Sequence, residues 1–361
     1  MKQHRNLLLA VPLIVLAGCN SSSSGTHKAK VAKPAADYKF TESALDEIIE
    51  DREDYFEGMR LTYDGKSYEQ VQYAEGFGDI LLITRLADVH GQTIDVAVYN
   101  DRRNCHIYSP TTKLKTFDCR ANKRTVGKDK TLIQSEIDDS RESVMIEFYN
   151  EAFEALGSMG STILTASEVD GKVNIVTSFA FDDIYREIKP VNDPRNRSTL
   201  GVTTFLQLKD IVEKHVGQEM TMKFNSHIGG SGDDDINMYT GLLIHKTKMH
   251  TVVTPNGSVF SGGTDLFAAG QTRTLQRAKK IDNFETLKQI GVHSWGTEGK
   301  TAKDFPYTDE SHRKQATYFN TVMGEKGIDF YLFTLDSAPF NGEHWVTKVD
   351  SDKYQFITHI E

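Results

Sequence analysis

Residues 259–270 read VFSGGTDLFAAG, and this stretch sets a serine between a strand-like run and an apolar helical run. The preceding segment HTVVT (250–254) is typical of a strand, and TDLFAAG (264–270) is typical of a helix. Ser261 would therefore lie at a helix N-terminus, where peptide dipoles favour negative charge. It is either a helix cap or a nucleophile on a tight turn, with the N–H of Gly262 as an oxyanion donor.

A second glycine-rich turn precedes this one, in FNSHIGGSGDDDINMY (224–239). Gly229 and Gly230 would let the backbone approach a ligand closely and present N–H groups to an oxyanion. The aspartates at 233–235 are expected to cap the next helix and complement its dipole. No other ligand spacing supports a metal there, so we predict no metal site.

A histidine follows a third strand-like segment, in IGVHSW (290–295). A lone histidine is usually packed or hydrogen-bonded without a catalytic role. His293 becomes a functional candidate as the base that would activate Ser261.

Taken in order, these elements resemble the Clp protease proteolytic subunit and its superfamily, which also holds crotonases and signal peptide peptidase A. The matching residues are Asn225, Ser226, Gly229, Gly230, Ser231, Tyr239, Ser261, Gly263, Leu266, Ala268, Ala269, Gly270 and His293. The stretches GVHSW (291–295) and HWVT (344–347) are similar to uncharacterised periplasmic ClpP-like proteins. The resemblance covers about residues 160 to 361.

The resemblance implies a serine hydrolase without a cofactor. Ser261 would be the nucleophile and His293 the base, and Gly230 (or Gly229) and Gly262 would supply the oxyanion donors.

Two departures from the family pattern affect this expectation. His227-Ile228 replaces a proline in the oxyanion loop, and the family's aspartate position holds Thr358. A threonine can orient a histidine but cannot stabilise imidazolium with charge, and loss of that charge lowered kcat about 10⁴-fold in a serine protease. Asp350 or Asp336 could replace it in space, the site could work as a dyad, or it could bind without cutting.

The N-terminus predicts export and lipidation. A charged start and the apolar run Leu7–Leu16 are typical of a signal peptide over residues 1–18, too short for a membrane span. The segment LAGC (16–19) resembles a bacterial lipobox, which implies lipidation of Cys19. Asn20 after the cysteine favours the outer membrane, facing the periplasm. The polar residues 19–37 then form a flexible tether.

Cys105 and Cys119 remain as an even pair in an oxidising compartment, which favours a disulfide across a hairpin. Two free buried thiols are the alternative.

The remaining chain divides into two predicted domains. Residues 38–158 should form a β-rich α+β module, with a helix capped by Thr41, strands such as DILLITRL, and a closing helix over 143–156. Residues 159–361 alternate strands and helices, which predicts an α/β domain with mainly parallel pairing. Helices are expected at 203–216, 233–246 and 264–278. The resemblance implies a ClpP/crotonase-like β-α-β superhelix there.

Charge and composition narrow the class of partner. The net charge is −9 with scattered Lys and Arg, which does not match a nucleic-acid footprint. The sequence thus predicts a lipid-anchored periplasmic serine hydrolase with a peptide or protein substrate, attached to the membrane through its lipid. The alternative is a non-catalytic envelope binding or scaffold lipoprotein. Relatives form rings or trimers, so self-association is expected by analogy.

Overall fold

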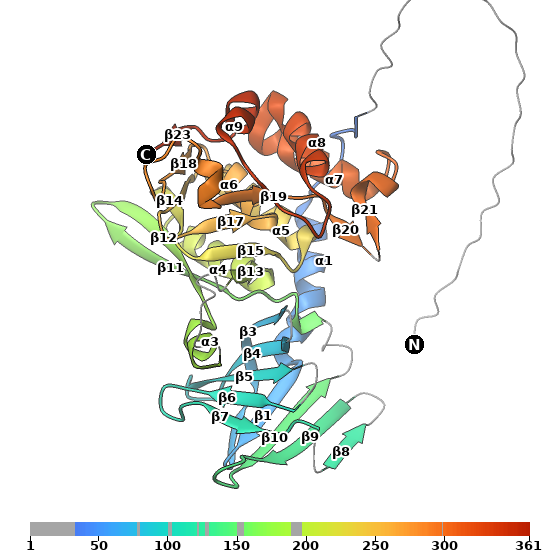
Figure 1. Ribbon diagram of the computed structural model, residues 1–361, viewed down its shortest axis with the longest axis vertical. Helices are drawn as coiled ribbons and strands as arrows, with labels where there is room; N and C mark the ends of the chain where they lie inside the picture. The colour runs from blue at the N-terminus through green and yellow to red at the C-terminus, as the bar shows by residue number, and fades with distance from the viewer. Residues whose placement is uncertain are drawn as a thin grey trace, which may run out of the picture. The chain divides into compact units, whose positions relative to one another are not determined.

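The computed structural model describes residues 33–77, 80–99, 103–120, 123–126, 130–149, 155–188, 197–297 and 299–361 (Figure 1). Pro34–Glu361 form one compact unit. The predicted signal peptide, Cys19 and residues 20–32 of the predicted tether lie outside the described residues.

The described residues of the N-terminal part contain ten strands. They are β1 Met59–Tyr63, β2 Lys66–Tyr68, β3 Gln70–Phe77, β4 Ile80–Ala87, β5 Thr93–Tyr99, β6 Cys105–Tyr108, β7 Lys115–Phe117, β8 Lys123–Val126, β9 Lys130–Glu136 and β10 Ser143–Tyr149. They make two five-stranded sheets, β2-β1-β10-β9-β8 and β3-β4-β5-β6-β7. Both sheets contribute to one hydrophobic cluster, for example through Leu61, Val96 and Ile146. The predicted β-rich character is therefore present.

The helix predicted over 143–156 is wrong in its first half, because these residues form β10. Val144, Ile146 and Phe148 are buried while the residues between them are more exposed. This period of two belongs to a strand. β10 pairs antiparallel with both β1 and β9, and these long-range partners override the local helical pattern.

Cys105 and Cys119 form a disulfide, as predicted. Strands β6 and β7 pair antiparallel, with Cys105 opposite Phe117, so the bond closes a hairpin. The two cysteines are 14 residues apart. In the chain-entropy view, a loop of this length contributes about 3 kcal/mol by restricting the unfolded chain.

The C-terminal part continues the strand numbering. Its strands are β11 Thr162–Val169, β12 Lys172–Phe179, β13 Arg197–Leu200, β14 Glu219–Phe224, β15 His227–Ser231, β16 His250–Val253, β17 Ser258–Phe260, β18 Arg273–Leu275, β19 Ile290–Val292, β20 Gly296–Thr297, β21 Lys300–Thr301, β22 His344–Trp345 and β23 His359–Ile360. The α-helices of the whole described chain are α1 Glu42–Glu53, which precedes β1, and then α3 Asp182–Ile188, α4 Val202–Lys214, α5 Asp234–Lys246, α6 Gly262–Ala268, α7 Glu310–Met323, α8 Gly327–Ser337 and α9 Lys348–Tyr354. The 3₁₀ helices are η1 Asp54–Glu57, η2 Phe284–Leu287, η3 Ala302–Asp304 and η4 Gly324–Lys326.

Two mainly parallel sheets organise this part. One has the order β11-β12-β14-β16-β18-β23 and the other β13-β15-β17-β19-β22. Successive chain segments add a strand to the first sheet, a strand to the second, and then a helix, as in β14-β15-α5 and β16-β17-α6. Only the β11–β12 and β19–β22 pairs within them are antiparallel. The predicted α/β class with a β-α-β superhelix is confirmed (Figure 1).

Two local predictions in this part need correction. The helix predicted over 264–278 ends at Ala268, and Arg273–Leu275 form strand β18 beside β16. Gly270 follows the end of the helix and allows the chain to approach β16 closely, since a Cβ there would lie 2.1 Å from the Thr251 hydroxyl. The glycines expected in a turn at 229–231 instead lie in strand β15, between β13 and β17.

Helix α1 (blue in Figure 1) packs on the parallel-sheet part of the chain. Thr41 caps it, as predicted, by accepting the N–H of Ala44. Its apolar face, which includes Ile48, belongs to the same cluster as Phe205 and Ile236. The domain boundary near residue 158 stays a prediction.

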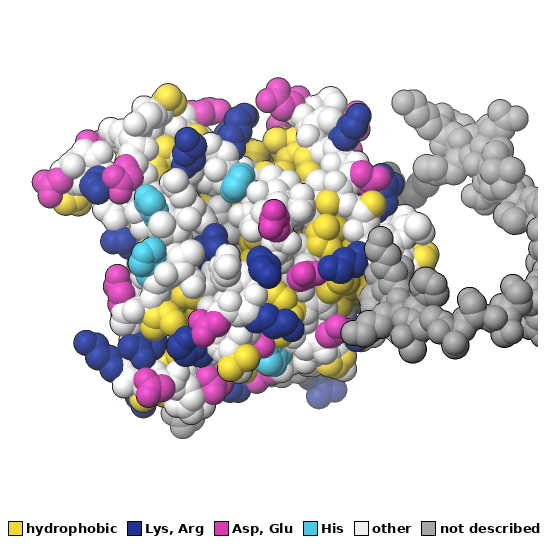
Figure 2. Space-filling model, turned by 90° about the horizontal axis from the view of Figure 1, so that it is seen from above, with side chains coloured by type: hydrophobic (Ala, Val, Ile, Leu, Met, Phe, Trp, Pro, Cys, Tyr) yellow, Lys and Arg dark blue, Asp and Glu magenta, His cyan; other side chains and the backbone are white. Residues whose placement is uncertain are grey.

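The surface in Figure 2 intersperses Lys and Arg with Asp and Glu, so its described atoms carry no extended basic patch. None of the helices that the described residues form has the length and apolar character of a membrane span.

Candidate active site

Ser261 lies on a sharp turn between β17 and α6. Its backbone has φ 53° and ψ −124°, a conformation that residues with a Cβ rarely adopt. The Ser261 N–H donates to the Gly291 carbonyl at 3.2 Å, and the Ser261 carbonyl accepts from the N–H groups of Thr264 at 2.8 Å and Asp265 at 3.2 Å. The surrounding hydrogen bonds therefore hold the serine in a strained position, which is a frequent feature of functional sites.

The two glycines after Ser261 allow α6 to approach strand β15. A Cβ on Gly262 would lie 2.7 Å from the Ser231 Cβ, and one on Gly263 would lie 2.8 Å from the Ile228 Cγ2. The two glycines after the serine are thus required by the close packing of α6 on β15.

Replacing Ser261 by glycine should stabilise the protein relative to Ser261→Ala by about 1 kcal/mol. Glycine relieves strain of about 1–3 kcal/mol but costs about 0.5–1 kcal/mol of unfolded-chain entropy. Both variants lose the hydroxyl, so their comparison by urea unfolding isolates the backbone. As a control, Ser258→Gly should be less stable than Ser258→Ala, since Ser258 lies in a strand. Equal stability of the two Ser261 variants would contradict a strained turn.

His293 contacts Ser261 directly. Its Nε2 lies 2.8 Å from Ser261 Oγ, and its Nδ1 lies 2.6 Å from the backbone carbonyl of Phe340. A carbonyl only accepts, so Nδ1 carries the proton and Nε2 is free to accept one from the serine. Burial lowers the pKa of His293, while the hydrogen bond to Phe340 opposes this in part. The imidazole is therefore neutral near pH 7 and suited to act as a base.

The proposed third member Thr358 does not reach His293. Its hydroxyl accepts from the N–H of Arg273 at 2.7 Å and donates to the Arg273 carbonyl at 3.1 Å, which joins β23 to β18. The structure therefore corrects this assignment: the Phe340 carbonyl takes the place at Nδ1. A backbone carbonyl leaves no signal in a sequence, because every residue has one.

The two aspartates considered as substitutes have other partners. Asp350 accepts from His344 at 3.0 Å and caps α9 together with Thr347. Asp336 pairs with Lys303 at 2.6 Å. Neither carboxylate is bonded to His293, and its Nδ1 bonds the Phe340 carbonyl instead of a charged group.

Of the two candidate glycines in β15, Gly230 is the one that faces the serine. Its backbone has φ 154°, and a Cβ there would lie 3.6 Å from the Ser261 Cβ and 3.8 Å from its Oγ. A Cβ on Gly229 would instead meet the Arg197 side chain at 3.1 Å. The N–H of Gly262 lies in the first turn of α6, where the helix itself supplies no acceptor. Gly230 and Gly262 thus flank the serine.

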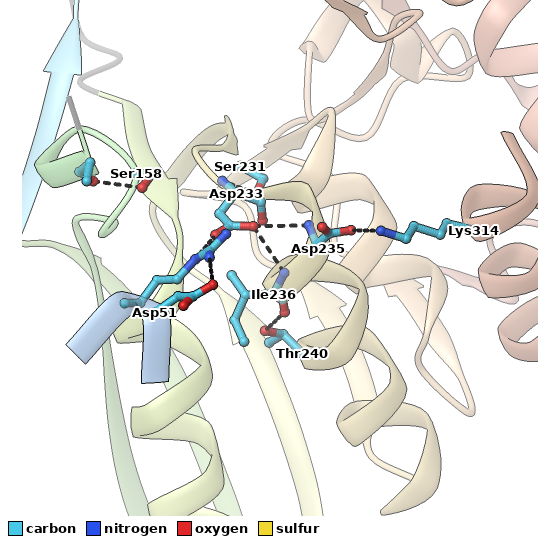
Figure 3. A network of polar contacts seen from close by, with 10 residues as sticks. Asp51, Ser158, Ser231, Asp233, Asp235, Ile236, Thr240 and Lys314 are labelled. Atoms are coloured by element: carbon cyan, nitrogen blue, oxygen red, sulfur yellow. Dashed lines mark hydrogen bonds and ion pairs between the residues drawn. The ribbon is translucent and has the colours of Figure 1, made fainter. Parts of the chain in front are cut away.

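The start of α5 is a dense polar network (Figure 3). Asp233 accepts the N–H groups of Asp235 and Ile236 and caps the helix, as predicted. Asp233 also pairs with Arg52, and Asp235 pairs with Lys314, each at 2.9 Å. Within the described ranges, no group of three or more His, Cys, Asp or Glu side chains could hold a metal ion.

A cavity opens beside the Ser261–His293 pair. Its lining includes both residues and also Asp234, Asp265 and Gln315. These last three residues are not among the site residues predicted from the sequence. Asp265 follows Ser261 by one helical turn, and this spacing could have placed it near the serine from sequence alone.

Comparison with known proteins finds no matching family model and no matching curated protein. Solved structures with a similar arrangement include a protein from Pseudomonas aeruginosa, at 12% identity and TM-score 0.34, covering 55% of this chain and 77% of that one. An enoyl-CoA hydratase from Bacillus anthracis matches at 8% identity and TM-score 0.33, covering 55% and 69%. A monofunctional enoyl-CoA isomerase from M. smegmatis matches at 10% identity and TM-score 0.33, covering 55% and 76%. At these identities the likeness concerns fold alone.

Proposed function

We propose that this protein is a serine hydrolase that cleaves a peptide bond or another acyl bond. The observation that carries the proposal is the 2.8 Å contact between Ser261 Oγ and the unprotonated Nε2 of His293, made by a serine on a strained strand-to-helix turn. A serine that only capped the helix would accept a hydrogen bond from a backbone N–H in the first turn of α6. The Ser261 side chain makes no such capping hydrogen bond.

The reaction follows from the two side chains. Ser261 Oγ adds to the substrate carbonyl carbon while its proton passes to His293 Nε2. The carbonyl oxygen becomes an oxyanion held by the N–H groups of Gly230 and Gly262. The oxyanion then collapses, the bond to the leaving group breaks, and His293 returns the proton to that group. Water repeats the sequence on the acyl-enzyme, which releases the acid and restores Ser261.

The Phe340 carbonyl orients the imidazole but offers only a dipole to the imidazolium that forms. A carboxylate in that position has been worth about 10⁴ in kcat. We therefore expect a lower kcat than that of a hydrolase with a full triad. The rate enhancement over the uncatalysed reaction would come mainly from the base and the oxyanion donors.

Covalent labelling tests the proposal. The purified full-length protein in mild detergent is treated with a fluorophosphonate, and the adduct is mapped by mass spectrometry. We expect one adduct, on Ser261, that is absent from Ser261→Ala. A folded wild-type protein without an adduct would favour the alternative of a non-catalytic binding or scaffold protein.

We also propose that the hydrolase is anchored by a lipid on Cys19 at the periplasmic face of the outer membrane. The lipobox-like residues 16–19 support this, and the disulfide between Cys105 and Cys119 fits an oxidising compartment. Cys19→Ala should move the protein out of the membrane fraction of fractionated cells. Retention of that variant in the outer membrane would argue against the lipid anchor.

A further inference from the structure

The cavity beside Ser261 is small and rich in hydrogen-bond acceptors. Its volume is about 40 Å³, and one water needs roughly 10–15 Å³. It therefore has room for a few non-hydrogen atoms next to the nucleophile. A second cavity of about 340 Å³ lies next to the first and shares Asp234, Trp295 and Gln315 with it.

Asp234 differs from the aspartates on either side of it. Asp233 is paired with Arg52. Asp235 is paired with Lys314, as Figure 3 shows. Asp234 lies between them and makes no ion pair within the described chain, and it lines the cavity. Its side chain is exposed at the edge of the cavity, and desolvation by the surrounding protein, with the charges of Asp233 and Asp235, raises its pKa to about 6.

Asp265 adds a second carboxyl group to the same cavity. It is half-buried, lies one turn after Ser261 on α6, and has no cationic partner among the described residues. Burial raises its pKa well above the ordinary range, and the charge of Asp234 raises it further. Two nearby carboxyl groups without a cation repel each other when both are ionised. A positively charged ligand between them would stabilise their ionised forms.

Gln315 is an independent sign of a ligand. Its side chain is 8% exposed, and its buried Oε1 has no hydrogen-bond partner. A buried acceptor without a partner costs free energy unless a donor arrives. The Tyr331 hydroxyl, also in the wall, is already engaged, since it accepts from Trp295 Nε1 and bonds His312 Nδ1. The acceptor atoms left for a ligand are those of Asp234, Asp265 and Gln315.

We propose that this cavity is a specificity pocket for a basic side chain, the ammonium of lysine or the guanidinium of arginine, adjoining the bond that Ser261 attacks. The proposal rests on the proposed hydrolase function and names its substrate class. Ammonium and guanidinium groups supply several donors and a positive charge to three acceptors. An organic cation fits better than a metal ion, since the described residues contain no metal-holding cluster.

The test uses two peptidyl phosphonate esters that differ only in the side chain at the reacting position. One carries the aminobutyl group of lysine and the other the butyl group of norleucine, and EDTA is present throughout. The wild-type protein should react with the lysine probe on the order of 10- to 100-fold faster, as expected for hydrogen bonds to a charged group. The ratio should fall towards about 1 in Asp265→Asn and in Asp234→Asn. Because the ratio is taken within each variant, a general loss of reactivity cancels.

Asp210→Asn is the control, on helix α4 and outside the walls of both cavities. Its carboxylate is paired with Lys214 at 2.6 Å. This variant should keep the wild-type ratio. A wild-type preference for norleucine, or an unchanged ratio in both Asp234→Asn and Asp265→Asn, would overturn the pocket.

A binding measurement separates this proposal from the hydrolase function. Calorimetry of butylammonium with Ser261→Ala needs the pocket but no nucleophile. Binding there that is lost when Asp265→Asn is added supports the pocket even if no phosphonate reacts with the wild type. If butylammonium does not bind while the fluorophosphonate labels Ser261 of the wild type normally, the proposed pocket for a basic side chain is wrong and the proposed hydrolase function stands.

Discussion

His293→Ala should slow the fluorophosphonate labelling of Ser261 by about 10³-fold or more, because a general base contributes roughly 10²–10⁴ and the imidazole also orients the hydroxyl. The second-order rate constant of labelling is the measurement. His227→Ala is a matched control, since His227 Nδ1 lies 2.8 Å from Ser258 Oγ in the neighbouring strands. That second Ser–His contact has the same length but an ordinary strand backbone, so labelling of Ser261 should persist.

The pH profile checks the same prediction in the wild type. Only the neutral imidazole can accept the serine proton, so labelling should rise with pH through the pKa of His293. Burial lowers that pKa from 6.5, so the half-maximal rate should lie below pH 6.5. Labelling of His293→Ala near the wild-type rate, or a profile without this acidic limb, would mean that the histidine does not activate the serine.

Gly230→Ala should lower the labelling rate by about 10²–10³-fold, which is the usual cost of losing one oxyanion donor. The added methyl would lie 3.6 Å from the Ser261 Cβ, where the reacting carbonyl or phosphoryl group must enter. The φ of 154° also disfavours a side chain, so the strand would shift away from its productive position.

Gly229→Ala provides the comparison for Gly230→Ala. Gly229 has no positive φ, and its Cβ would meet the Arg197 side chain on the other side of the strand. Its labelling rate should stay within about tenfold of the wild type, because the donor geometry is retained. A larger loss in Gly229→Ala than in Gly230→Ala would reverse the assignment of the oxyanion donor.

The sequence by itself determined the local elements that build the site. Apolar spacing and the serine-glycine-glycine triplet predicted the strand, turn and helix around Ser261, because these are short-range properties. The alternation of strands and helices after residue 160 predicted the parallel α/β class. The even cysteine pair predicted the disulfide, and the order of motifs paired Ser261 with His293.

Only the tertiary structure decided which groups meet at that site. The carbonyl that bonds His293 Nδ1 belongs to Phe340, 47 residues further along the chain. The Thr358 hydroxyl bonds the Arg273 backbone instead. Residues 143–149 became strand β10 since β1 and β9 offered partners that no local pattern reveals. Asp234 and Asp265 share a cavity because α5 and α6 pack together, whereas the sequence suggested only helix capping for Asp234 and no role for Asp265. Hydrogen-bond partners and cavities depend on contacts between residues far apart in the chain. Local patterns in a single sequence do not reveal those contacts.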